Sequence, residues 1–387
     1  MTKFFATSIS ALPSGEAFWY DKTIQPDAYV INSLRVFLSS GWDRVRAQLN
    51  RRQVMMLLLL AAVYVVAAKL GLSLAISTRQ VTAIWPPTGI ALAVTLIGGY
   101  RFLPGIFLGA FTANLLTSEP AGVALGIACG NTLEAFIGTA LLRRLRFTPT
   151  FEQAQDFVTY LICAGLIATA ASATIGTLSL GVGGLITWPG FAPTWLTWWL
   201  GDMMGGLIVG PFLLTCAYRE TRRILRERLF ESILIFSATL AVSVLAFTIH
   251  IDPPWPFPLA AYIIFPVMIW ASFRLAQIGV TATTIIVSAT ALCATLEALG
   301  PFAAGASIEH NLIFLQSFVL IVFASSMFLA ITVARRSRAE HELQKLTARL
   351  QEANQRATDI LADVMEKTSP TTSARGRREL GHDSAHS

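Results

Sequence analysis

Ionisable and amide side chains inside long apolar segments are the first candidates for chemistry in this sequence. Glu134 follows Asn131 by three residues, and Asp202 follows Trp198 by four. Residues three or four apart lie on one face of a helix, so each spacing predicts a polar pair pointing in one direction. Because a carboxylate at membrane depth is costly unless it is solvated or paired, each pair marks a candidate site.

Two further features add polar groups. Asn114 lies in another apolar segment, and the run Trp85-Pro86-Pro87-Thr88-Gly89 interrupts a third. Proline removes a helical hydrogen bond, which frees carbonyl groups that can face a polar cavity. Together these residues predict a buried pocket for a small polar or cationic ligand, or for a proton. The candidate ligand-binding or signal-sensing residues are Trp85, Pro86, Pro87, Asn114, Asn131, Glu134, Trp198 and Asp202.

A purely structural interpretation of the two carboxylates stays open. Glu134 and Asp202 could cap broken helices, or pair with Lys69 or with an arginine from a loop. Lys69 could instead extend its ammonium group toward the membrane surface.

Signatures of catalysis are not found in the sequence. It contains no nucleotide-binding, zinc-protease, serine-hydrolase or kinase motif. The four cysteines are scattered through apolar segments without the spacing of a metal site. We therefore expect no enzymatic activity, no cofactor and no metal.

Composition indicates that the elements holding these residues are membrane helices. The chain has 387 residues, of which 54% are hydrophobic and only 13% charged, whereas soluble domains have about a quarter charged residues. Apolar segments of about 20 residues, enough to cross a bilayer, recur along it. The formal charge of +6 comes from basic residues clustered in short loops, so we expect lipids and no nucleic acid as partners.

The predicted fold is an all-α, polytopic bundle of about ten spans. Segments 81–99, 102–118 and 257–272 are short and interrupted by Gly and Pro, which makes half-spans and a total of eight the alternative. The ten candidate segments are 54–77, 81–99, 102–118, 120–142, 156–182, 195–217, 230–250, 257–272, 276–299 and 310–334.

Charge alternates along these segments. With the N-terminus inside, every cytoplasmic loop carries arginine, whereas the external loops carry only Arg79 among Lys and Arg. This pattern predicts an even number of crossings and both termini in the cytoplasm.

The flanking segments are expected to be cytoplasmic. Residues 1–53 precede the first span and include a possible amphipathic helix from Tyr29 to Leu49, and residues 54–334 form the membrane domain. Residues 335–367 predict a parallel, dimeric coiled coil, and 368–387 a disordered tail. A solitary amphipathic helix is the alternative for 335–367. The predicted dimer seam consists of Leu343, Leu346, Leu350, Ala353, Ala357, Ile360 and Val364.

An ordered set of short pieces resembles the MASE1 integral membrane sensory domain of bacteria. The pieces are Trp85–Ala93, Pro104–Ala110 with Asn114, Gly130–Ala135, Trp198–Asp202, Phe273–Leu275, Gly300–Phe302 and Leu315–Phe318. The resemblance covers roughly Leu57 to Arg338. It implies a sensory input domain of the bacterial inner membrane, usually described with eight spans, that precedes a kinase, cyclase or phosphodiesterase module.

No such output module follows the predicted seam in this sequence. We therefore expect a membrane sensor that passes an unknown stimulus through a dimeric cytoplasmic helix to a separate partner, possible examples being a kinase or a cyclase. The alternative function is a small-solute transporter or channel, which broken helices and buried carboxylates would also fit.

Overall fold

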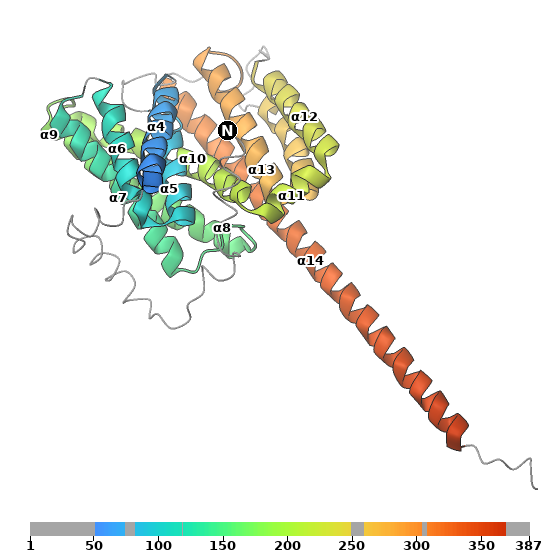
Figure 1. Ribbon diagram of the computed structural model, residues 1–387. Helices are drawn as coiled ribbons and strands as arrows, with labels where there is room; N and C mark the ends of the chain where they lie inside the picture. Colours follow the sequence, from blue (N-terminus) through green and yellow to red (C-terminus); the bar gives the residue numbers. More distant parts are fainter. Residues whose placement is uncertain (1–50, 74–81, 118, 249–258, 304–307, 369–387) are drawn as a thin grey trace, which may run out of the picture. The chain divides into compact units, whose positions relative to one another are not determined.

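The computed structural model describes residues 51–73, 82–117, 119–248, 259–303 and 308–368. The predicted amphipathic segment before residue 50 and the tail after residue 368 lie outside these ranges. The described residues form helices joined by short turns and contain no strand, so the all-α prediction is confirmed for them (Figure 1).

The helices follow one another in the order of the predicted apolar segments. Their bounds are α4 Arg51–Ser73, α5 Pro86–Gly98, α6 Leu103–Leu115, α7 Ala121–Arg144, α8 Ala154–Tyr160, α9 Thr169–Val182, α10 Phe191–Ala217, α11 Arg219–Glu227, α12 Leu229–Thr248, α13 Ile264–Leu296 and α14 Ile308–Thr368. A π-helical stretch, Leu161–Ala168, joins α8 to α9. Short 3₁₀ turns lie at Tyr100–Phe102, Trp188–Gly190 and Leu259–Ile263.

Among the described residues, seven helical runs are long and apolar enough to cross a membrane. They show a multi-pass membrane protein, while the predicted total of ten stays a prediction. The seven runs are Arg51–Ser73, Ala121–Arg144, Ala154–Val182, Trp188–Ala217, Leu229–Thr248, Ala261–Leu296 and His310–Met365.

Helices α5 and α6 are the short pieces that Gly and Pro delimit. Each has 13 residues, about 20 Å of helix at 1.5 Å per residue, whereas a membrane core is about 30 Å thick. Pro86 and Pro87 open α5, where a missing N–H costs nothing. Gly99, with φ of 87°, ends it. Segments 81–99 and 102–118 therefore form half-length helices, as their composition indicates.

Helix α13 is broken at Ala276, which has non-helical angles of φ 50° and ψ −148°. A Cβ placed on Gly279 would lie 3.2 Å from the carbonyl oxygen of Ala271. Eight residues of straight helix would separate the two positions by about 12 Å. The chain thus folds back at Ala276, and the predicted segments 257–272 and 276–299 correspond to two separate helical arms.

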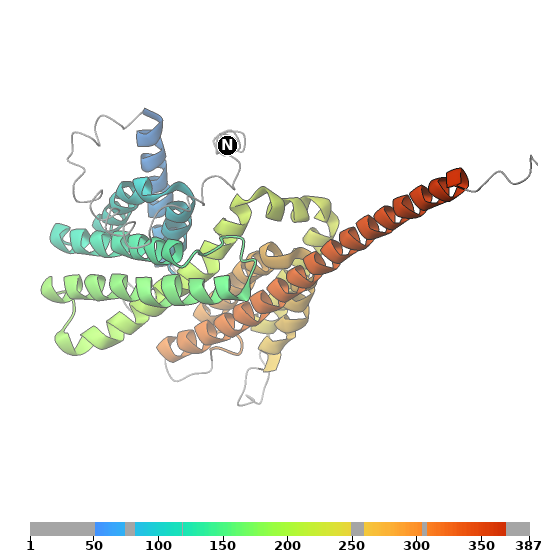
Figure 2. The same ribbon diagram turned by 90° about the horizontal axis from the view of Figure 1, so that it is seen from below.

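Glycines set the closest contacts between the helices. Gly105 and Gly109 of α6 face α4, and Gly126 and Gly130 of α7 face α9. In Figure 2, α7 and the run from α8 to α9 lie side by side as two long teal and green helices. These glycines therefore lie at helix contacts, where small residues let backbones approach closely.

An apolar and aromatic core joins α8 and α10 to the later helices. The ring of Phe157 lies 5.5 Å from that of Phe323 and 5.3 Å from that of Phe328. The largest buried cluster includes Met203 of α10, Met268 of α13 and Met327 of α14. The membrane part of α14 is thereby held inside the bundle.

The chain divides into two compact units, Met1–Val333 and Ala334–Ser387. In the second unit the described residues form the continuation of α14, and their side chains are exposed from Arg335 onward wherever exposure is described. The predicted dimer seam lies on this helix, so a helical conformation of 335–367 is confirmed. Its pairing into a coiled coil stays a prediction.

Candidate functional site

The extended segment before α5 passes directly over α10. The backbone N–H of Trp85 donates to the carbonyl oxygen of Gly201 over 2.9 Å. A Cβ on Gly205 would lie 1.8 Å from the Trp85 carbonyl oxygen, and one on Gly201 would lie 2.4 Å from that of Thr82. Only glycine at these two positions allows the segment to lie so close, and this contact brings Trp85 beside the carboxylate of Asp202.

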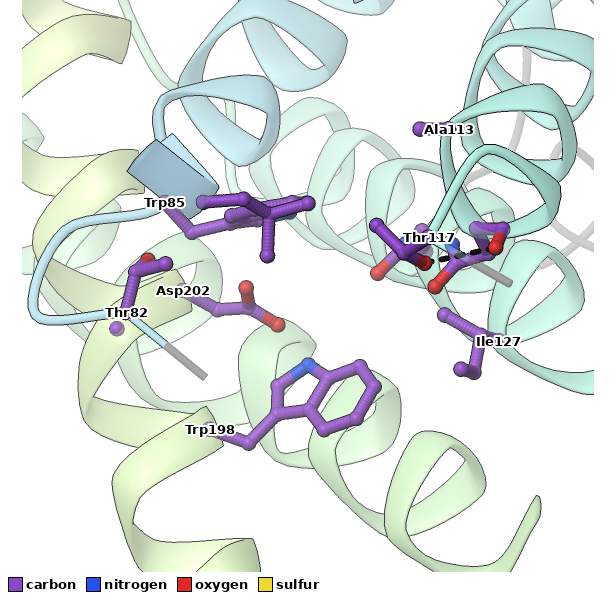
Figure 3. A pocket seen from close by; sticks show the side chains of 11 residues that line it. Thr82, Trp85, Ala113, Thr117, Ile127, Trp198 and Asp202 are labelled. Carbon is purple, nitrogen blue, oxygen red and sulfur yellow. Dashed lines mark hydrogen bonds between the residues drawn. The ribbon is translucent and has the colours of Figure 1, made fainter. Parts of the chain in front are cut away.

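Helix α10 presents Trp198 and Asp202 on one face, as their spacing predicts. Asp202 is 1% exposed and Trp198 is 8% exposed. In Figure 3 the carboxylate of Asp202 points into the space between the indole rings of Trp85 and Trp198. The site therefore has an acidic group between two aromatic walls.

Helix α7 supplies the second polar pair. Glu134 is 4% exposed and accepts a hydrogen bond from the hydroxyl of Thr88, with 3.3 Å between Oγ1 and Oε2. Asn131, one turn away, accepts a hydrogen bond from the hydroxyl of Ser172 on α9 over 2.9 Å. The structure thus brings Glu134 next to the start of α5.

A cavity of about 20 Å³ lies beside Asp202. This volume is enough for about one water-sized species, since a water needs about 10–15 Å³ of such space. Thr117 lies across from Asp202 in Figure 3, and Asn114 is also a lining residue. The lining residues are Leu72, Thr82, Trp85, Ala113, Asn114, Thr117, Ile127, Asn131, Trp198, Gly201 and Asp202.

Each carboxylate keeps one buried oxygen without a hydrogen-bond partner in the described part of the chain. These atoms are Oε1 of Glu134 and Oδ2 of Asp202. No salt bridge recorded between described residues includes either group, and Lys69 is exposed. The interpretation in which Lys69 pairs with them is therefore not supported, and no described basic side chain forms a salt bridge with either group.

Not every predicted residue faces the cavity. Pro86 and Pro87 open helix α5 and are not among the lining residues. The carbonyl oxygen of Trp85 accepts the N–H of Thr88 over 3.3 Å, so it turns toward the helix. The carboxylate of Glu134 lies deeper, beside Thr88. The lining side thus includes Trp85, Asn114, Asn131, Trp198 and Asp202, with Glu134 as their neighbour.

Sequence reasoning missed four residues of this region. Tyr64 of α4 is 1% exposed and lies near Glu134, Asp202 and Trp85. Thr88 and Ser172 carry no sequence signal, because hydroxyls in helices usually bond to their own backbone. Gln316 does carry a sequence signal, because it is an amide side chain inside an apolar segment, as Asn131 is. Its Nε2 donates to the carbonyl oxygen of Ala83 over 2.7 Å.

Comparison with known families agrees with this arrangement. The model of the family described as MASE1 matches residues 56–337, well over half of the chain. The chain belongs to the MASE1 family. MASE1 is an integral membrane sensory domain family, and no output-domain family is detected in the chain. No curated protein and no solved structure matches it.

The MASE1 match and the site coincide. Three of the sequence pieces that carry the resemblance, Trp85–Ala93, Gly130–Ala135 and Trp198–Asp202, meet around the two carboxylates. A fourth, Leu315–Phe318, contains the Gln316 that bonds to the segment before α5. The match ends at residue 337, near the start of the second unit.

Proposed function

We propose that this MASE1 protein detects a stimulus at the Glu134–Asp202 region and passes it through α14 to a separate partner. The observation that carries the proposal is the position of α14. Gln316 of this helix donates to Ala83, in the same extended segment that supplies Trp85 to the cavity. The same helix continues to Thr368. A shift of that segment therefore acts directly on the helix that leads out of the membrane domain.

The output in this proposal is a homodimer. The seam residues Leu343, Leu346 and Leu350 are 64%, 54% and 71% exposed in the single chain. Their three- and four-residue spacing suits burial against a second parallel copy. Ala353 and Ala357 weaken the seam, so a modest change in the membrane domain suffices to shift the register or the association of the helices.

Charges at the helix ends support the proposed orientation in a bacterial cytoplasmic membrane, with both termini inside. The guanidinium of Arg143, at the end of α7, donates to the carbonyl oxygens of Thr95 and Leu96, at the end of α5. Arg274, just before the break in α13, is paired with Glu231 at the start of α12. Both arginines belong to loops that the alternation of charge assigns to the cytoplasm.

The lengths of the helices favour eight full-length crossings, with α5 and α6 as an additional short pair. Seven helical runs are of spanning length, and the break at Ala276 makes two arms of one of them. Helices α5 and α6 follow one another through the turn at Tyr100–Phe102, and as a pair they keep the number of crossings even. A count of ten arises when each of these two helices is taken as a full span.

Cysteine cross-linking tests the proposed output. With the four native cysteines replaced by alanine, Ala353→Cys places a thiol in the seam and Ala348→Cys places one on the opposite face. Both positions are exposed alanines of one helix, so the pair is matched. In native membranes under oxidation we expect a disulfide-linked dimer for Ala353→Cys and little for Ala348→Cys.

The same cross-linking assay tests whether the Glu134–Asp202 region is coupled to the dimer seam of α14. Asp202→Asn, which keeps the side-chain shape, is expected to change the cross-linking rate at Ala353→Cys. Absence of any dimer along residues 343–364, or equal cross-linking on both faces, would rule out the dimeric helix. If substitutions at Asp202 and Glu134 leave the cross-linking rate unchanged, the site takes no part in signalling through this helix.

Transport stays the second candidate, because the half-length helix α5 begins beside two buried carboxylates, an arrangement that transporters use. Solute flux into vesicles containing the purified protein, lost in Glu134→Gln or Asp202→Asn, would favour it. Flux that is equal in empty and protein-containing vesicles would favour the sensor.

A further inference from the structure

The cavity beside Asp202 has the composition of an ion site. Its walls combine the carboxylate of Asp202 with the amides of Asn114 and Asn131 and the hydroxyls of Thr82 and Thr117. Oxygen atoms of these types are the ligands that hard cations prefer. The indoles of Trp85 and Trp198 close two sides, and aromatic faces attract cations as well.

The charge of the region calls for a positive partner. Asp202 is 1% exposed and its Oδ2 has no hydrogen-bond partner, and the same holds for Oε1 of the neighbouring Glu134. Among the residues that the structure describes, no lysine, arginine or histidine lines the cavity. Ionising both buried carboxyl groups without a positive partner costs several kcal/mol each. A cation in the cavity would offset that cost and take the free oxygen of Asp202 as a ligand.

Size and charge limit which cation fits. About 20 Å³ holds one water-sized species, which favours a small bare ion over an organic ammonium ion or a hydrated cluster. Mg²⁺ dehydrates reluctantly and usually keeps several waters, for which this cavity has no room. No group of three or more His, Cys, Asp or Glu side chains suited to a metal occurs in the described residues. A bare monovalent ion is the cation that remains.

We propose that this cavity is a binding site for one small monovalent cation of the size of sodium, held by Asp202 and stabilised by the nearby charge of Glu134. The inference rests on the proposed sensing role for its biological consequence, whereas binding of the ion can be tested independently of that role. A bound ion fixes the position of Asp202. It thereby fixes the contact that the segment from Thr82 to Trp85 makes with α10. Gln316 of α14 binds to the same segment at Ala83. Exchange of the ion thus acts on the position of α14.

The test compares thermal unfolding of the full-length protein in detergent, at constant ionic strength and pH, in sodium, potassium, magnesium or choline chloride. Choline is too large for the cavity. We expect sodium, and to a smaller extent potassium, to raise Tm by a few degrees relative to choline. The shift should disappear in Asp202→Asn and decrease in Glu134→Gln. The control Asp156→Asn makes the same chemical change in a buried capping residue of α8 and should keep the shift.

Each outcome decides the proposal. Equal Tm in sodium and choline, a response to magnesium alone, or a sodium shift that persists in Asp202→Asn would overturn it. If Asp202→Asn fails to fold, equilibrium dialysis of the wild type with radioactive sodium replaces it: about one ion per chain supports the site, and none refutes it.

Failure here is separable from failure of the proposed function. Cross-linking at Ala353→Cys needs no added ion and tests only the dimeric helix. A protein that dimerises through the seam without any sodium response would keep its signalling role and lose the ion site. A sodium response without seam contacts would leave an ion-binding membrane protein with a different output.

Discussion

Helix α14 has two parts that differ in the burial of their apolar side chains. In the membrane domain, Leu315, Phe323 and Met327 are at most 1% exposed, and Gln316 donates to a neighbouring segment. Beyond Ala334, large apolar side chains such as Leu350 and Ile360 are more than 60% exposed. The large apolar side chains of one continuous helix are thus buried in its first part and exposed in its second.

The difference shows what each part is suited to do. Tight packing around Phe323 transmits displacement, because close-packed side chains have no space in which to absorb it. An exposed row of Leu and Ile on a helix in water is stable only when another surface covers it. In the proposed function, the membrane part receives motion from the site, and the exposed part binds a second copy of the chain.

The largest expected effect comes from removing a ring in the buried part. Phe323→Ala deletes an aromatic side chain that packs edge-on against Phe157. We expect it to lower the free energy of unfolding by about 3–5 kcal/mol through lost contacts and the cavity left behind. Thermal unfolding in detergent measures the loss. The corresponding change Leu350→Ala, in the exposed part, should leave the Tm of the membrane domain unchanged. Equal losses of stability in the two variants would contradict the difference in packing between the two parts of α14.

The next effect concerns the hydrogen bond between α14 and the site segment. Gln316→Leu keeps the approximate side-chain size but leaves the Ala83 carbonyl oxygen without its donor. The expected cost is about 1–3 kcal/mol of stability. Cross-linking at Ala353→Cys should also become insensitive to Asp202→Asn. Gln355→Leu, an exposed glutamine whose amide bonds only to Asp359 one turn away, is the control. Undiminished coupling in Gln316→Leu would show that motion reaches α14 by another route.

A third effect is confined to the cytoplasmic part. Leu346→Lys places a charge in the predicted seam, and we expect dimer cross-linking at Ala353→Cys to fall about tenfold, which corresponds to ~1.4 kcal/mol. The free energy of unfolding of the membrane domain should not change. Lys345→Leu, next in sequence to Leu346 but directed away from the seam, serves as the control and should not reduce cross-linking. A dimer untouched by Leu346→Lys would place the contact on a different face of the helix.

Much of this comparison was accessible from the sequence. Apolar segments and their charged ends gave the order of the helices, because the bilayer demands long apolar runs and arginine in the cytoplasmic loops. Spacing alone paired Asp202 with Trp198. It could not show that the segment before α5 crosses α10 at Gly201 and Gly205, because that contact joins residues more than a hundred positions apart.

The remaining gaps have a common physical cause. The meeting of Gln316 with Ala83 spans 233 positions, and nothing in either local sequence encodes it. The fold-back at Ala276 depends on a single residue with positive φ that is not glycine, so no turn signal precedes it. Local pattern identifies which residues need partners, while long-range packing decides which partners they receive.

The smallest expected effect tests whether surface charge contributes to the cytoplasmic part. Arg336 and Glu340 form an ion pair one turn apart, with side chains 82% and 57% exposed. Pairs of this kind stabilise a helix by about 0.3–0.5 kcal/mol, and salt screens them. Arg336→Gln should therefore leave cross-linking at Ala353→Cys within twofold of the unchanged chain. A larger decrease, reproduced by high salt in the unchanged chain, would mean that charge holds the dimer and that the exposed leucines have another partner.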